Sequence, residues 1–141
     1  MNTQEQTLIE FPELRRFMLI GGLNVAIFYG LYEGMYYLSA GLEHRAAMSW
    51  IIAYSMGSIV AHTTHRLFTF RSSVPIEHSL PTAVAIYGTT LILSTFSEVV
   101  LIEIQGWHHR LAWLFNASIF GILIYILLRH FAFPTRLSED E

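Results

Sequence analysis

Residues 111–128 read LAWLFNASIFGILIYILL, a stretch without a single charged side chain. A transmembrane helix needs about 20 mainly apolar residues, each adding about 1.5 Å to its length. This stretch therefore predicts a helix over about 111–130 that crosses a lipid bilayer, and it governs the interpretation of the rest of the chain.

Three further apolar runs of similar length precede it, over about 17–42, 46–70 and 82–104. Together the four runs take up nearly all of the 141 residues. The sequence thus predicts an all-α integral membrane bundle of four transmembrane helices, in a domain over 17–134. Residues 1–16 are expected to form an N-terminal cytoplasmic or interfacial segment, and residues 135–141 an acidic tail.

The composition supports a membrane protein and excludes several kinds of chemistry. Hydrophobic residues make up 53% of the chain and charged residues only 13%, against about 25% charged in soluble domains. There is no cysteine, which excludes disulfides, thiolate metal sites and thiol catalysis. No basic block for nucleic acid, no nucleophile–base pair and no phosphate loop is visible, so we expect neither an enzyme nor a cofactor.

The arginines predict how the bundle is oriented. Four spans place both termini and the loop near 71–81 on one side of the membrane. Six arginines fall on that side: Arg15, Arg16, Arg66, Arg71, Arg129 and Arg136. Only Arg45 and Arg110 fall on the other. By the positive-inside rule, both termini are expected in the cytoplasm.

A weak internal repeat accompanies the four runs. The second run ends in Arg66-Leu-Phe-Thr-Phe70 and the fourth in Arg129-His-Phe-Ala-Phe133, both of the form R-x-F-x-F. The chain is therefore interpreted as two helical hairpins of the same orientation, a parallel repeat. Chance is the alternative, because Arg and Phe are each common at membrane boundaries.

Two motifs carry a family resemblance. The first is R-R-F-x-x-x-G-G-x-N, from Arg15 to Asn24, and the second is H-R-x-F-T-F, from His65 to Phe70. In order and spacing the chain resembles the GtrA-like family over roughly residues 14–134. The resemblance implies a small protein of the cytoplasmic (inner) membrane of a prokaryote. It would move a polyprenyl-phosphate-linked sugar across that membrane for cell-surface polysaccharide or glycolipid synthesis, or assist the glycosyltransferase that makes it.

A polar stripe at the inner end of the second run suggests where a lipid phosphate would bind. His62, His65 and Arg66 lie on this stripe, and Arg129 at the end of the fourth run provides a second guanidinium. Guanidinium forms forked hydrogen bonds with phosphate, and imidazole can donate or become cationic. Asn24 on the first run lies at a similar depth and adds an amide donor. The alternative is that Arg66 and Arg129 reach the lipid headgroups as topology anchors.

Acidic residues lie in the outer half of the predicted bundle. Glu33 and Glu98 each lie about 24 Å from the inner boundary, and Asn116 lies at the same depth. Carboxylates inside a membrane are costly and are candidates for functional sites. We therefore predict that these three bind sugar hydroxyls or a proton. For Glu33, a structural hydrogen bond to Tyr29 or Tyr37 is the alternative.

No metal site is predicted, and three functions remain open. His62 and His65 have the spacing of two zinc ligands, but no further ligands lie near them. The first function is flipping of a polyprenyl-phosphate sugar, and the second is a non-catalytic membrane subunit that anchors a glycosyltransferase. The third is proton-coupled export of small cations, because the chain also resembles the small multidrug resistance family.

Four helices enclose little room for a sugar, so a homodimer or a groove open to membrane lipids is expected.

Overall fold

The computed structural model describes residues 11–133, with side chains from residue 15 onward, and these residues form an all-α fold. Four helices make it up: α1 (Phe11–Leu38), α2 (Arg45–Thr64), α3 (Ile76–Val99) and α4 (His109–Leu127). Three of them end in a short π-helical segment, namely η1 (His65–Thr69), η2 (Val100–Ile104) and η3 (Leu128–Ala132). The predicted N-terminal segment lies outside the described residues up to position 10, and the acidic tail lies outside them entirely.

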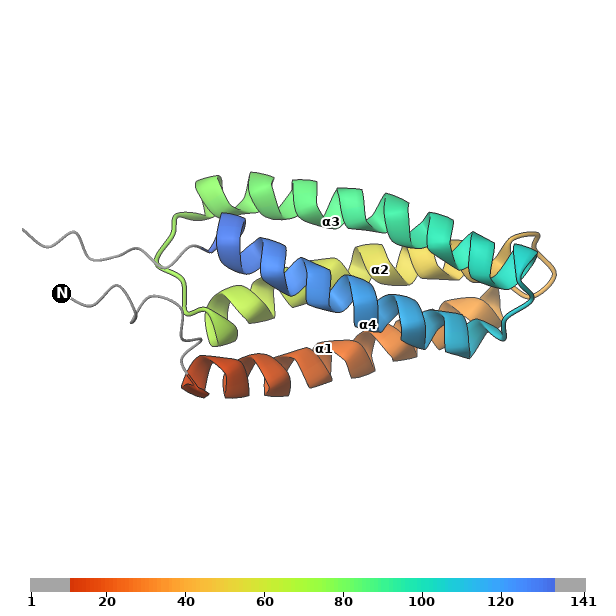
Figure 1. Cartoon of the computed structure of the whole chain (residues 1–141), viewed down its shortest axis with the longest axis horizontal. Coiled ribbons are helices and arrows are strands. Elements are labelled where there is room, and N and C mark those ends of the chain that lie inside the picture. Colours follow the sequence, from red (N-terminus) through yellow and green to blue (C-terminus); the bar gives the residue numbers. More distant parts are fainter. Residues whose placement is uncertain (1–10, 134–141) are drawn as a thin grey trace, which may run out of the picture.

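The four helices lie side by side and alternate in direction (Figure 1). Along one side of the bundle α1 packs on α2 and η1, α2 packs on α3, and α3 packs on α4. We call the end where α1 begins and η3 finishes the terminus end. The opposite end, where short links join α1 to α2 and η2 to α4, is the hairpin end.

The helices extend beyond the apolar runs at the terminus end. α1 begins at Phe11 rather than near 17, and α3 begins at Ile76 rather than near 82. The extra turns are polar, and a helix can contain polar turns where it extends out of the hydrocarbon core of the membrane. Pro75 precedes α3 in an extended conformation, with φ −55° and ψ 141°, and so sets where that helix begins. The apolar run thus marks the membrane-crossing part of a helix rather than its full length.

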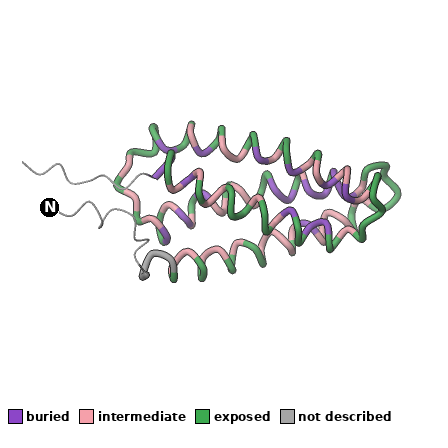
Figure 2. The backbone as a smooth tube through the Cα atoms, viewed as in Figure 1, coloured by how far each residue is buried: buried purple, intermediate pink, exposed green. Residues whose placement is uncertain are grey.

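Three helical stretches are long and apolar enough to cross a membrane: Arg15–Leu38, Ile76–Ile104 and His109–Ala132. The remaining helix, α2, is not among these three, but its outward face is also apolar, with Ile59 71% exposed. On the neighbouring helices Leu19, Ile92 and Ile122 are 63–71% exposed. Exposed residues run along the outside of every helix in Figure 2. A large apolar outer surface of this kind is what a lipid environment requires.

Aromatic packing forms the core of the hairpin half. Tyr32, Trp50 and Trp113 are buried there, and Phe28 lies edge-on to Trp50 with ring centroids 5.0 Å apart. Gly57 on α2 lies against the Phe28 ring, and a Cβ atom at that position would make an ordinary van der Waals contact with it at 3.6 Å. By contrast, Gly30 and Gly34 on α1 face open space, so this small-residue pair does not pack inside the bundle.

The two R-x-F-x-F segments have the same local conformation. Each forms a π-helical turn, and its last amide donates to a carbonyl five residues back, from Phe70 to His65 and from Phe133 to Leu128. The Phe70 and Phe133 rings stack against each other with centroids 5.0 Å apart. The two segments therefore meet across the bundle at the terminus end.

At the hairpin end, His44 in the link between α1 and α2 contacts Glu103 of η2. His44 Nδ1 lies 2.6 Å from Glu103 Oε1, and the contact is solvent-exposed. The hydrogen bond to Glu103 raises the pKa of His44 above its usual value, with a further contribution from the same negative charge. Because the folded-state pKa is raised, the contact stabilises the fold fully below about pH 6.5. This stabilisation is lost as the pH rises through the folded-state pKa.

We predict that an NMR titration of imidazole signals will show a raised pKa for His44. Glu103→Gln removes the acceptor charge, so the pKa of His44 should fall toward that of an unperturbed histidine. Glu77→Gln, at the far end of the bundle, is the matched control and should leave the His44 titration unchanged. Identical His44 titrations in Glu103→Gln and the parent would contradict the contact.

Candidate functional site

A buried polar layer connects all four helices in the hairpin half. Glu98 on α3 is fully buried; it accepts a hydrogen bond from the Tyr32 hydroxyl of α1 at 3.3 Å and one from Asn116 Nδ2 of α4 at 2.5 Å. One turn away, the Trp50 indole of α2 donates to Ser94 Oγ at 3.0 Å. In a bilayer such groups must find partners within the protein, so this layer fixes how the helices face one another.

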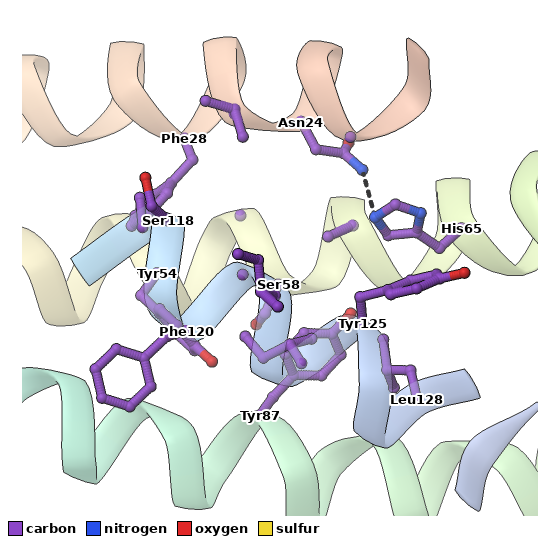
Figure 3. A pocket seen from close by; sticks show the side chains of 18 of the residues that line it. Asn24, Phe28, Tyr54, Ser58, His65, Tyr87, Ser118, Phe120, Tyr125 and Leu128 are labelled. Atoms are coloured by element: carbon purple, nitrogen blue, oxygen red, sulfur yellow. Dashed lines mark hydrogen bonds between the residues drawn. The ribbon is translucent and has the colours of Figure 1, made fainter. Parts of the chain in front are cut away.

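A cavity of about 490 Å³ lies between α1, α2 and α4. Its walls are mostly aromatic and aliphatic, and glycines on three helices line it, among them Gly22, Gly57 and Gly121. The polar groups on the wall include Asn24, His65 and Asn116. Among the described residues that line it, none is Arg, Asp or Glu. Figure 3 shows side chains from α1, α2 and α4 converging on this space.

The cavity opens on the outer surface of the bundle, along the seam between α1 and α4. Two lining residues on its rim, Met18 of α1 and Ile122 of α4, are 66% and 63% exposed. Since that surface is apolar on all helices, the opening faces the place where lipid chains would lie. The volume falls within the usual range for a ligand site, about 300–1,000 Å³.

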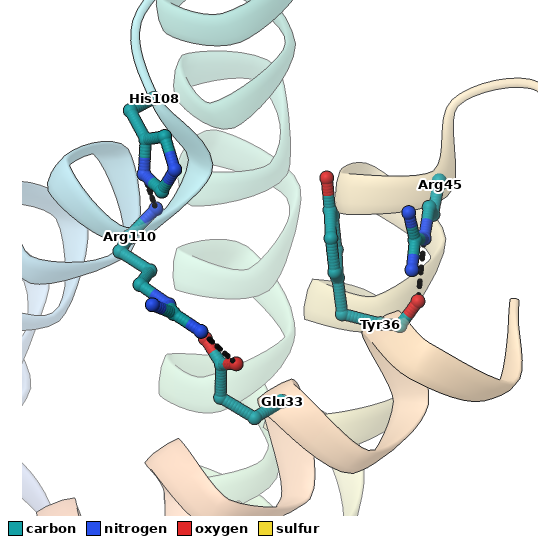
Figure 4. Close-up of polar contacts among 5 residues, drawn as sticks. All are labelled: Glu33, Tyr36, Arg45, His108 and Arg110. Carbon is teal, nitrogen blue, oxygen red and sulfur yellow. Dashed lines mark hydrogen bonds and ion pairs between the residues drawn. The ribbon is translucent and has the colours of Figure 1, made fainter. Parts of the chain in front are cut away.

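Side chains close the α1–α4 seam above and below the cavity. At the terminus end the Phe17 and Tyr125 rings lie 4.0 Å apart between centroids. At the hairpin end Arg110 donates two hydrogen bonds to the Glu33 carboxylate, both 3.0 Å long, as drawn in Figure 4. Beside this pair the Tyr36 and His109 rings stack 3.8 Å apart. The cavity thus lies between an aromatic closure and an ion-pair closure.

Comparison with protein families identifies the chain. Residues 16–133 match the family described as GtrA/DPMS, transmembrane domain. The chain belongs to this GtrA family. Neither a curated protein nor a solved structure matches it significantly. It is therefore a multi-pass membrane protein of a family that is linked in general to polyprenyl-sugar translocation and is generally considered non-catalytic.

Two of the predicted phosphate-binding residues meet in this GtrA-family fold. Asn24 Nδ2 lies 2.9 Å from Thr64 Oγ1 and 3.3 Å from His65 Nε2. On its other side His65 Nδ1 lies 2.9 Å from Thr69 Oγ1, and the Phe17 ring stacks on the imidazole at 5.5 Å. Asn24 and His65 therefore lie together on the cavity wall, toward the terminus end.

The remaining predicted phosphate-binding residues lie away from the cavity. Arg66 donates to Ser79 Oγ at 2.8 Å and to the Val74 carbonyl at 2.7 Å, and so secures the link between η1 and α3. His62 is buried against the Phe133 ring, with centroids 5.8 Å apart. Arg129 lies in η3, with Nη1 3.5 Å from the Phe133 carbonyl. Within residues 11–133, no group of three or more His, Asp or Glu side chains is arranged to hold a metal ion.

The predicted sugar-binding residues separate into two places. Glu98 and Asn116 belong to the buried polar layer described above. Their predicted equal depth in the membrane is accompanied by a direct hydrogen bond between them. Glu33 does not join them, because it is held by Arg110 at the α1–α4 seam. Its main partner is Arg110 in the first turn of α4. It also forms a side-chain hydrogen bond with Tyr29, one of the two tyrosines considered as alternatives.

Several residues of the site have no signal in the sequence. Tyr32, Ser94 and Tyr87 are ordinary residues on apolar helices, and only the packing brings them to Glu98 or to the cavity. Arg16 extends Nε to within 3.4 Å of the Thr69 carbonyl, next to His65. The R-R-F motif drew attention to Arg16 as part of the family resemblance. The sequence did not indicate which of the terminus-end arginines lies near the cavity.

We predict that Asn24→Leu will destabilise the folded protein by about 1–3 kcal/mol, because Thr64 and His65 lose a partly buried hydrogen-bond partner. The midpoint of thermal unfolding in detergent measures the effect. Ser55→Ala is a suitable control, since the exposed Ser55 hydroxyl bonds only the Ile51 carbonyl of its own helix. Equal stability of Asn24→Leu and Ser55→Ala would show that the contact between α1 and α2 contributes little.

Proposed function

We propose that this protein flips a polyprenyl-phosphate-linked sugar across the cytoplasmic membrane of a prokaryote, in the service of cell-surface polysaccharide or glycolipid synthesis. The observation that carries the proposal is the uncharged cavity that opens sideways between α1 and α4. A lipid with a long tail can enter such a site only from the membrane. The lateral opening lets the headgroup occupy the cavity while the tail stays among the lipid chains.

The lining suits the headgroup better than it suits an ion. Aromatic faces and a few amide, hydroxyl and imidazole groups surround the space, and such surfaces accommodate a sugar ring. Transfer of a bare charge into this space would be costly. For this reason the cation-export alternative is disfavoured, and one of its two candidate acids, Glu33, is already paired with the guanidinium of Arg110.

The phosphate is proposed to bind near the terminus end. Asn24 and His65 are the polar groups on that part of the wall, and Arg16 lies beside them. His62, Arg66 and Arg129 complete the set proposed from the sequence, at the same end of the bundle but outside the cavity. Guanidinium groups grouped at one end attract a phosphodiester there without placing charge in the middle of the membrane.

The two closures support movement by alternating access. Opening of the Phe17–Tyr125 pair would connect the cavity with the terminus end, and opening of the Glu33–Arg110 pair would connect it with the hairpin end. Because α1 packs on α2 and α4 packs on α3, the seam between α1 and α4 can widen at the cavity while each of these helix pairs stays packed. Opening at the hairpin end would also separate Trp113 of α4 from Phe28 and Tyr29 of α1.

Transport of a lipid-linked sugar by the purified protein in liposomes tests this function. Gly121 lines the cavity and its Cβ position is open, so Gly121→Leu should fill the cavity and slow flipping at least tenfold. Gly88→Leu on α3 is matched to it, because Gly88 is exposed, also faces open space and does not line the cavity. It should flip at the parental rate.

The results separate the candidate functions. Equal rates for Gly121→Leu and Gly88→Leu would mean that substrate does not pass through the cavity. Absence of flipping by the parent, combined with co-purification of a glycosyltransferase, would favour the non-catalytic subunit. Proton release on addition of a small cation, lost in Glu33→Gln, would favour the exporter.

The proposed orientation predicts which loops are reached from outside the cell. Since the chain has no cysteine, single replacements give unambiguous labelling. A membrane-impermeant maleimide should label Gln105→Cys at the hairpin end in intact cells, and should label Ser73→Cys at the terminus end only after the cells are broken. The reverse pattern would place the termini outside the cytoplasm.

A further inference from the structure

Two buried polar atoms on the cavity wall have no partner within the described chain. They are Oδ1 of Asn116 and the hydroxyl oxygen of Tyr87. Buried polar groups in folded proteins are nearly always hydrogen-bonded, so an unpaired group on the wall of a cavity points to a ligand that completes it. Asn116 as a whole is fully buried, so solvent at the surface of the bundle does not satisfy it.

Contacts with α3 fix the orientation of the Asn116 amide. Its nitrogen lies 2.5 Å from Glu98 Oε2 and 3.4 Å from the Ser94 carbonyl. Both neighbours are acceptors, so the donor Nδ2 must point toward α3. The carbonyl oxygen, on the other branch of the amide, is then presented on the opposite side as a pure acceptor. Glu98 is held in turn by Tyr32, which makes it a positioning residue for Asn116.

The Tyr87 hydroxyl adds a group that can donate or accept. Its ring packs against both buried apolar clusters, the one around Trp50 and the one around Leu128. The ring is therefore held in place, and the hydroxyl is presented on the cavity side. The wall thus offers one fixed acceptor and one adaptable hydroxyl.

We propose that Asn116 and Tyr87 recognise hydroxyl groups of the sugar, with Glu98 setting the direction of the Asn116 carbonyl. A sugar hydroxyl donates to the carbonyl and can accept from the tyrosine. Phosphodiester oxygens only accept and cannot pair with the Asn116 carbonyl, and an isoprene chain offers no hydrogen bond at all. The inference rests on the proposed function for the nature of the substrate, and it assigns which part of that substrate occupies this wall.

Equilibrium binding to the full chain in detergent tests the assignment. One probe is farnesyl-phosphoryl-glucose and the other is farnesyl methyl phosphate, which has the same charge and no sugar. Trp50 lines the cavity, so tryptophan fluorescence reports occupancy. The parent protein should bind the glycosylated probe more tightly than the methyl diester.

Asn116→Leu and Tyr87→Phe should each weaken binding of the glycosylated probe about five- to tenfold, the value of one hydrogen bond. Neither should change the affinity for the methyl diester. Glu98→Gln keeps a carbonyl that can accept from Asn116 and should preserve selectivity, whereas Glu98→Leu should abolish it. Glu98→Leu added to Asn116→Leu should cost nothing further, because both act through the same carbonyl. Tyr37→Phe, at an exposed position of α1, is the control.

A purely structural role would give a different result. If Asn116→Leu and Tyr87→Phe weaken both probes equally, or leave the preference for the glycosylated probe intact, the assignment is overturned. Flipping in liposomes is scored separately. Flipping by a parent protein that lacks selectivity would refute this site and keep the proposed function, and selective binding without flipping would refute transport and keep the site.

Discussion

The buried carboxylate of Glu98 is the constraint on which the bundle depends. Lipid offers no hydrogen bonds, so a carboxylate on an apolar helix must be matched by the other helices. Tyr32 of α1 and Asn116 of α4 supply the donors, and the adjoining Trp50–Ser94 bond brings in α2. One polar layer therefore connects all four helices, and any rotation of a helix about its axis would break a buried bond.

Because this layer and the aromatic core hold the hairpin half together, the terminus half can be more open. α1 packs on α2 and η1, and α4 packs on α3. In the terminus half, α1 and α4 therefore meet through side chains such as the Phe17–Tyr125 pair. Small residues on both sides of the seam then leave a cavity instead of a packed interface. The site is thus a consequence of looser packing between α1 and α4 away from the buried polar layer.

The sequence was sufficient for the four helices, since hydropathy determines them. Depth along a helix placed Glu98 and Asn116 at one level, but it placed Glu33 there as well and so did not decide which of the three are in contact. The sequence was also not sufficient to divide the polar stripe of α2. His62 and Arg66 are about one helical turn apart and therefore lie on one face. At 100° per residue, His65 lies about 60° away from His62 around the helix axis. It contacts α1 instead. The Glu33–Arg110 pair was also missed, because it depends on the register of α1 against α4, which no local pattern records.

The distribution of charge assigns different roles to different parts of the proposed path. Arginines lie at the terminus end and at the hairpin end, and the cavity between them is lined by no charged residue within the described chain. In the proposed path the guanidinium groups at the terminus end would attract a phosphodiester, and the unpaired hydrogen-bonding atoms of Asn116 and Tyr87 would meet the sugar in the middle. The phosphate charge would then stay near a membrane surface, where its desolvation costs least. A headgroup held by its hydroxyls midway would carry the phosphate across the region in which it has no partner of its own.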